Sequence, residues 1–126
     1  MASAGNWFET RRKSHKLREK NITTSATVTT YTVRTGGPTY DFIEDAIVNV
    51  TTAESCDITI TMPDGTYAGQ IVIINFVTEA SAETVTVTAS TGSGGDSTMT
   101  SAGQYMVLMW TNATTGWVAI SESVAS

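Results

Sequence analysis

The sequence contains few residues of the types that cross-link or bind metals. It has one cysteine, Cys56, and one histidine, His15. A single cysteine permits no internal disulfide, so covalent cross-links do not stabilise the fold. One Cys and one His fall short of the ligands of a tetrahedral zinc site, unless carboxylates or other subunits contribute. We expect neither a metal nor a cofactor, and we interpret Cys56 as a small buried or half-buried side chain before a strand.

Long apolar runs are also missing. No stretch approaches the roughly 18 consecutive apolar residues of a membrane-spanning helix, so we expect no membrane partner. The opening residues, MASAGNWFETRRKSHK, lack the apolar stretch of a secretory signal, and we expect a protein that is made in the cytoplasm. The 126 residues are 40% hydrophobic, which suits one domain with its own core.

Positive charge is confined to the beginning of the chain. No Lys or Arg follows Arg34, whereas residues 35–126 hold ten Asp and Glu. The first 20 residues carry a net charge of +4, although the whole chain has a net charge of −5. Such asymmetry indicates an arm that docks on a partner. We therefore predict a basic N-terminal arm over residues 1–21 and a β-domain over residues 22–126.

The predicted arm combines aromatic and basic side chains. Trp7 and Phe8 are candidate apolar anchors, and six cations are candidate pairing groups. Asn6 and Glu9 form a plausible capping box, but the apolar face is too thin to hold an isolated helix in water. Whether the arm is helical or extended stays open, and we expect contact with a partner to order it. The predicted docking residues are Trp7, Phe8, Arg11, Arg12, Lys13, Lys16, Arg18 and Lys20.

The rest of the chain has the composition of β-strands. It is rich in Thr, which occurs 24 times in the sequence, much of it in alternating or β-branched runs. Short runs separated by turn residues predict a small all-β domain of about eight strands, an antiparallel sandwich or barrel. A helical turn at 41–45 stays open, and 35–40 and 90–97 are candidate exposed loops. The predicted strands are 22–33, as one or two strands, 46–51, 57–62, 71–77, 84–89, 105–111 and 117–121.

Two of these strands do not alternate between apolar and polar residues. The segments IVIINFV (71–77) and YMVLMW (105–110) are apolar on both faces, whereas a strand with one solvated face alternates. We expect another layer, a further copy of the chain, to cover the second face. The alternative is a central strand that loops of the same chain bury. The predicted interface residues are Ile71, Ile73, Phe76, Met106, Leu108, Met109 and Trp110.

Several short motifs follow one another along the chain. A Thr/Ile strand (58–62) leads into Pro63 and Asp64, and Gly69 and Gln70 precede an apolar strand (71–76). A Val-Thr-Val strand (85–87), a Gly-rich loop (92–95), an aliphatic strand (106–110) and a Gly-Trp pair (116–117) complete the series. This order resembles the small β-domain of bacteriophage fibre, head-fibre and capsid-decoration proteins. The resemblance covers about residues 40–121 and implies a homotrimer without catalytic activity.

Within that group, the short arm favours a decoration (cement) protein over a fibre. Only about 20 residues precede the first predicted strand, too few for a fibre shaft. We expect a virion structural protein that is made in the host cytoplasm, binds the major capsid protein on the outer capsid surface and stabilises the shell.

Three other functions are weaker. A fibre or receptor-binding tip would use Tyr67, Tyr105, Trp110 and Trp117 to stack on sugar rings, but the two tryptophans flank one predicted hairpin and are expected to pack across strands or in the core. Nucleic-acid binding through the arm is disfavoured because the acidic body would repel a polyanion. The third alternative is that the arm binds no partner and is a solvated tail.

We expect no enzyme activity. The candidate carboxylate groups are Asp41, Glu44 and Asp45, and the pair Asp57 and Asp64. Scattered acids on strand edges are usually solvated surface, and spacing alone does not establish a cation site.

Overall fold

The computed structural model describes residues 18–36 and 45–123. These residues form nine strands and no helix, which confirms the all-β prediction. The structure has one more strand than the expected eight, because Ser97, the last residue of the predicted loop 90–97, and the two residues after it pair as a short strand. The strands are β1 (Glu19–Thr23), β2 (Thr30–Thr32), β3 (Ile47–Thr51), β4 (Ile58–Met62), β5 (Ile71–Thr78), β6 (Val85–Ala89), β7 (Ser97–Met99), β8 (Tyr105–Trp110) and β9 (Trp117–Ser123).

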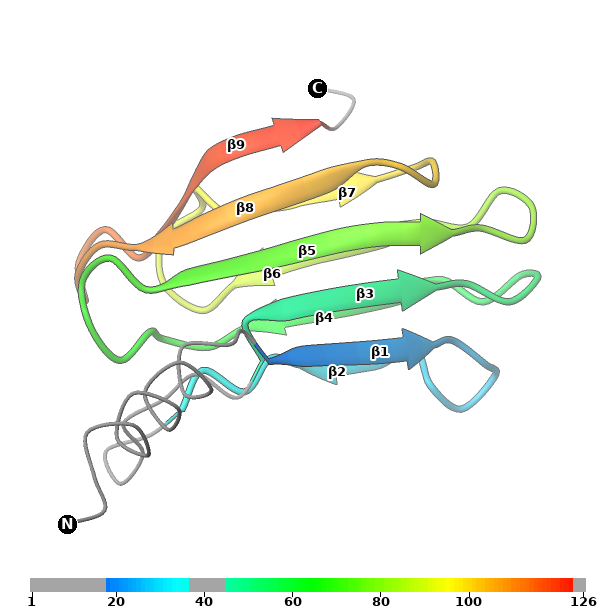
Figure 1. Ribbon diagram of the computed structural model, residues 1–126, viewed down its shortest axis with the longest axis horizontal. Coiled ribbons are helices and arrows are strands. Elements are labelled where there is room, and N and C mark those ends of the chain that lie inside the picture. The colour runs from blue at the N-terminus through cyan, green and yellow to red at the C-terminus, as the bar shows by residue number, and fades with distance from the viewer. Residues whose placement is uncertain (1–17, 37–44, 124–126) are drawn as a thin grey trace, which may run out of the picture.

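The strands form two stacked sheets. One sheet has the order β1-β3-β5-β8-β9 and the other has the order β2-β4-β6-β7. Figure 1 shows the two layers, with β2, β4, β6 and β7 behind the first sheet. From β1 to β6 the chain alternates between the sheets, and β7 to β9 then complete both layers.

This alternation corrects the expected antiparallel arrangement. Four of the seven strand pairings are parallel, β1–β3, β3–β5, β2–β4 and β4–β6, and only the pairings of β7, β8 and β9 are antiparallel. Between two neighbouring strands of one sheet, the chain crosses to the other sheet and returns. It therefore enters each sheet in the same direction, and the neighbours are parallel.

The parallel strands stack in a regular register. Asn21 lies beside Asn49, and Asn49 lies beside Asn75, across β1, β3 and β5. On the other sheet, Thr30, Thr59 and Thr86 occupy matching positions of β2, β4 and β6. The first six strands are thus three successive turns of a coil, each with one strand in each sheet.

The core lies between the two sheets and is built from alternate residues of each strand. In β5 the inward side chains are Val72, Ile74 and Phe76, all at most 1% exposed. Trp110 and Trp117 pair across β8 and β9 with ring centroids 5.6 Å apart and an interplanar angle of 61°. Trp117 Nε1 also donates to the Pro63 carbonyl oxygen at 2.7 Å. The predicted packing of these tryptophans across strands is confirmed.

Candidate functional site

Most of the predicted docking arm lies outside the described residues. This applies to Trp7, Phe8, Arg11, Arg12, Lys13 and Lys16. The structure places Arg18 and Lys20 in the folded body. The Arg18 carbonyl oxygen accepts hydrogen bonds from the backbone N–H groups of Ala46 and Ile47, at 3.1 and 3.0 Å. β1 begins at Glu19, so the predicted boundary between residues 21 and 22 falls within a strand.

A buried carboxylate organises the β1–β2 end of the sandwich. Asp45 is fully buried and accepts hydrogen bonds from the Tyr31 hydroxyl and, at 2.9 Å, from the Arg34 backbone N–H. Arg34 Nη2 lies 3.2 Å from Asp45 Oδ1. The Lys20 ammonium lies 5.5 Å from the centroid of the Tyr31 ring, within the range of a cation–π contact. Lys20 and Tyr31 therefore join β1 to β2 at this end.

The ion pair changes how its neighbours titrate. Burial, followed by the hydrogen bond to Asp45, raises the pKa of Tyr31 to about 12. The hydrogen bond to Asp45 likewise raises the pKa of Arg34 above its ordinary value. Both groups keep their protons throughout the neutral range, so the Arg34 guanidinium stays paired with the Asp45 carboxylate and the Tyr31 hydroxyl stays a donor to it.

Charge is separated along the sandwich. The three basic residues of the described chain, Arg18, Lys20 and Arg34, all flank or belong to β1 and β2, next to the point where residues 1–17 join the body. Glu19 and Asp45 lie at the same end, and the other described acids lie on other connections and strands. These are Glu54, Asp57, Asp64, Glu79, Glu83, Asp96 and Glu122.

The predicted interface residues divide into two groups. Phe76, Met106, Leu108 and Trp110 are at most 5% exposed and lie in the core of the single chain. Their apolar character needs no partner, which corrects that part of the interface prediction. Ile71, Ile73 and Met109 lie at the alternate positions of β5 and β8, point away from the core and are half-buried.

The three outward residues belong to a larger apolar surface that sequence reasoning missed. Ile73 lies between Ile47 of β3 and Val107 of β8. Met109 lies between Ile71 and Val118 of β9. We name this surface the aliphatic face. It comprises Ile47, Ile71, Ile73, Val107, Met109 and Val118, all half-buried.

The outer surface of the four-stranded sheet has a different composition. Its outward positions are threonines that align in rows across neighbouring strands. One pair in this array, Thr86 and Thr98, has hydroxyl oxygens 3.4 Å apart. We name this surface the threonine face. It comprises Thr30, Thr32, Thr59, Thr61, Thr86, Thr88 and Thr98.

A row of asparagines borders the aliphatic face. Asn75 Nδ2 donates to Asn49 Oδ1 at 3.0 Å, and Asn49 Nδ2 donates to Asn21 Oδ1 at 3.1 Å. Tyr105 pairs with Asn75 on the next strand, and its hydroxyl lies 3.4 Å from Ser121 Oγ. This rim is polar but uncharged.

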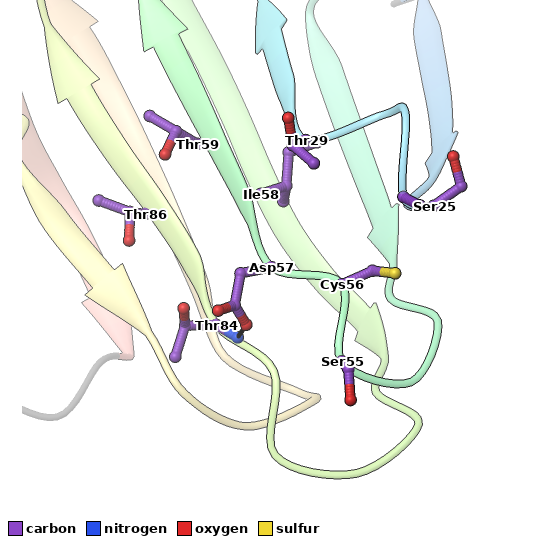
Figure 2. Close-up of a pocket in the computed structure, with 10 residues that line it drawn as sticks. Ser25, Thr29, Ser55, Cys56, Asp57, Ile58, Thr59, Thr84 and Thr86 are labelled. Carbon is purple, nitrogen blue, oxygen red and sulfur yellow. Dashed lines mark hydrogen bonds between the residues drawn. The ribbon is translucent and has the colours of Figure 1, made fainter.

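A shallow groove of about 520 Å³ lies where the threonine face meets the loops before β2 and β4 (Figure 2). Its lining is mainly hydroxyl groups, with Cys56 and Asp57 at the β3–β4 connection. Asp57 Oδ1 accepts the Thr84 backbone N–H at 2.8 Å, so the carboxylate holds two connections together. In Figure 2 the Cys56 sulfur and the Asp57 carboxylate point in different directions. The groove thus contains no converging pair of reactive groups.

The pair Asp57 and Asp64, considered for catalysis, does not converge. Asp57 precedes β4 and Asp64 follows it, so they lie at opposite ends of that strand. Asp64 accepts hydrogen bonds from the hydroxyls of Ser90 and Thr91, each at 2.7 Å, and these bonds lower its pKa. Asp41 and Glu44 lie outside the described residues. Within 18–36 and 45–123 no group of three or more His, Cys, Asp or Glu is placed to hold a metal ion.

The aromatic residues considered for sugar stacking are also separated. Trp110 and Trp117 are buried, whereas Tyr67 is 53% exposed and Tyr105 lies on the outer surface of the five-stranded sheet. The two tryptophans therefore cannot contribute to an exposed platform.

The chain matches no protein-family model and no curated protein. In the described part of the chain, no helix is long and apolar enough to cross a membrane.

Proposed function

We propose that the protein is a virion structural protein, a capsid decoration (cement) protein that binds the outer capsid surface as a homotrimer. The basic N-terminal arm attaches the acidic all-β body to the major capsid protein and so stabilises the shell. The sandwich is the small β-domain that the sequence motifs resemble, although its sheets are mixed rather than antiparallel.

The separation of charge is the observation that carries this proposal. The first 20 residues carry a net charge of +4, and the basic residues of the described chain, Arg18, Lys20 and Arg34, flank or belong to β1 and β2. A basic arm on an acidic body orients the protein toward an acidic surface and keeps the body away from it. The attached body is thereby directed outward.

Three tethered arms explain how a short segment can bind firmly. One arm, with Trp7 and Phe8 as anchors and a few cations, offers a small contact. Joining three arms raises their effective concentration and can increase affinity about 10²-fold or more. Contacts with more than one capsid subunit would also resist separation of those subunits.

Nucleic acid is the main competitor for the arm. Its phosphates attract the Lys and Arg side chains of the arm, but the Asp and Glu side chains of residues 35–126 repel a polyanion. High salt weakens both kinds of binding, so it does not separate them. Competition does: an excess of double-stranded DNA should leave the protein on purified capsids.

The decisive variant removes residues 1–17 and keeps Arg18 and the whole of β1. We expect this body to stay folded, with an unchanged circular dichroism spectrum, and to lose binding to undecorated capsids of the virus that encodes it. The matched control replaces Glu54 and Glu79 with Gln. It alters charge on the connections after β3 and β5, at the end of the parallel strands opposite Arg18, and should bind at the level of the unaltered chain. Binding of the truncated body at full occupancy would refute the role of the arm.

A further inference from the structure

We infer that copies of this chain associate through the aliphatic face, with the five-stranded sheets turned toward one another. The number of copies, three, rests on the proposed function, whereas the choice of face rests on the side chains alone. The inference names an interface that includes Ile47, Val107 and Val118 as well as the sequence-predicted Ile71, Ile73 and Met109.

The contrast between the two outer surfaces is the first argument. Both are surfaces of the same sandwich and both consist mainly of β-branched residues, but one is threonine and the other is isoleucine, valine and methionine. Threonine provides the β-branched shape that a strand favours and leaves a hydroxyl for water. The threonine face shows what a solvated surface of this protein looks like, and the aliphatic face lacks those hydroxyls. A contiguous apolar patch of this kind marks an interaction surface.

The distribution of charge identifies the partner as another copy. Among the described strand positions that face outward from the five-stranded sheet, Glu19 at the β1 edge is the only charged one. Two copies of a chain with a net charge of −5 repel each other least where acids are few, and the aliphatic face, with Glu19 beside Ile47 at its edge, meets that condition. An acidic or basic partner would instead be matched by opposite charges, and the aliphatic face has none.

The polar rim fits the same partner. Asn49 and Asn75 carry amides, and Tyr105 and Ser121 carry hydroxyls. Both kinds of group donate and accept hydrogen bonds, so a surface that bears them is complementary to itself. An apolar centre with an uncharged polar rim is the usual composition of a contact between protein subunits.

The size of the sheet limits how tightly this face can bind another copy. Five strands about 4.8 Å apart, with about five residues of about 3.3 Å each, give an outer surface of about 400 Å². A typical stable interface buries about 800 Å² on each partner. Contact through this face alone is therefore small, whether one neighbour or two neighbours around a common axis share it. We expect association that weakens on dilution.

The experiment measures solution mass by light scattering over a range of concentrations. The full chain should give three times the 13.4 kDa chain mass when concentrated. Ile73→Asp places a charge at the centre of the face and should give the mass of one chain. A double variant, Ile73→Thr with Met109→Thr, makes this surface resemble the threonine face and should do the same while keeping strand-forming residues. Thr61→Asp, on the threonine face, is the matched control and should leave the mass of the assembly unchanged.

Each outcome either supports the inference or overturns it. A full chain that remains one chain in mass at every concentration overturns it, whether or not that chain binds capsids. Unchanged mass in the folded double variant also overturns it, and if that variant no longer binds capsids, the face contacts the capsid instead. A mass of two chains supports the aliphatic face as the interface and contradicts an assembly of three copies. If the unaltered chain assembles, Ile73→Asp dissociates the assembly and the assembly binds no capsid, the interface is supported and only the decoration proposal is refuted.

Discussion

Asn49 connects two other asparagines: it accepts a hydrogen bond from Asn75 at 3.0 Å and donates one to Asn21 at 3.1 Å. Because Asn49 lies between the other two, Asn49→Ala leaves the Asn75 amide N–H without its acceptor and the Asn21 amide oxygen without its donor. We expect a loss of about 1–2 kcal/mol in the free energy of unfolding. Chemical denaturation measures this loss.

The control for this prediction is Thr51→Ala, at the next outward position of β3. In the described structure the Thr51 side chain makes no hydrogen bond to a neighbouring strand. If Asn49→Ala is no more destabilising than Thr51→Ala, the amide row does not hold the parallel strands together.

Gly116 is required by a close approach between two loops. Its φ is +80°, and a Cβ atom there would lie 1.9 Å from the Thr91 carbonyl oxygen. Gly69 has a similar φ of +91° but no atom within 4 Å of the corresponding position. Gly69→Ala should therefore lower stability by about 1 kcal/mol through backbone strain alone, and Gly116→Ala by several times as much. Thermal unfolding of both variants checks the difference, and equal effects would contradict the close approach.

The carboxylate of Glu83 makes stability depend on pH. It is 3% exposed and accepts hydrogen bonds from the backbone N–H groups of Ser81, Ala80 and Ser55 and from the Thr52 hydroxyl. Chiefly through the Ser81 bond, its pKa is lowered from 4.5 to about 2. Because the folded pKa is below the unfolded one, the stabilisation is complete above pH 4.5 and is lost as the pH falls toward 2.

Glu83→Gln should accordingly be less stable than the unaltered chain at pH 7 and should lose less stability between pH 5 and pH 2. Unfolding by urea at several pH values tests this. Parallel curves for the two proteins over that pH range would show that Glu83 does not titrate as described.

Tyr31 gives the opposite pH dependence. Its pKa is raised from 10.0 to about 12, first by burial and then by the hydrogen bond to Asp45. The folded pKa is above the unfolded one, so the contribution to stability is complete below pH 10 and disappears as the pH rises through 12. Tyr31→Phe should remove this dependence and cost about 1–3 kcal/mol at pH 7, because Asp45 loses a buried donor. Ultraviolet titration of tyrosinate in the two proteins provides the measurement, and an identical absorbance change up to pH 11 would support the raised pKa.

The strands were predictable because local alternation depends only on neighbouring residues. Segments such as 85–89 and 58–62 alternate, so both their extent and their buried face follow from the sequence. β7 was missed because Ser97 and Thr98 lie among glycines and polar residues that are typical of a loop. Its pairing with β6 comes from the tertiary structure.

The pairing of strands was not predictable from alternation. It depends on which segments return to the same sheet, and no short-range pattern records that. A signal was nevertheless present: Thr-x-Thr recurs at Thr30, Thr59 and Thr86, and Asn recurs at positions 21, 49 and 75. Their recurrence at nearly constant intervals is the coil repeat.

The aliphatic face was only partly predictable for a related reason. In 71–77 and 105–110 both faces are apolar, so alternation does not tell which residues point inward. Phe76 and Leu108 face the core and Ile73 faces outward, and only the position of the second sheet decides between them.

The most direct test of the decoration proposal is the temperature at which undecorated capsids of the encoding virus open and release their genome, measured with and without added protein. The account predicts that the full chain raises this temperature, whereas the body that begins at residue 18 leaves it unchanged. A release temperature that saturating full-length protein does not shift would contradict the claim that this protein stabilises a viral shell.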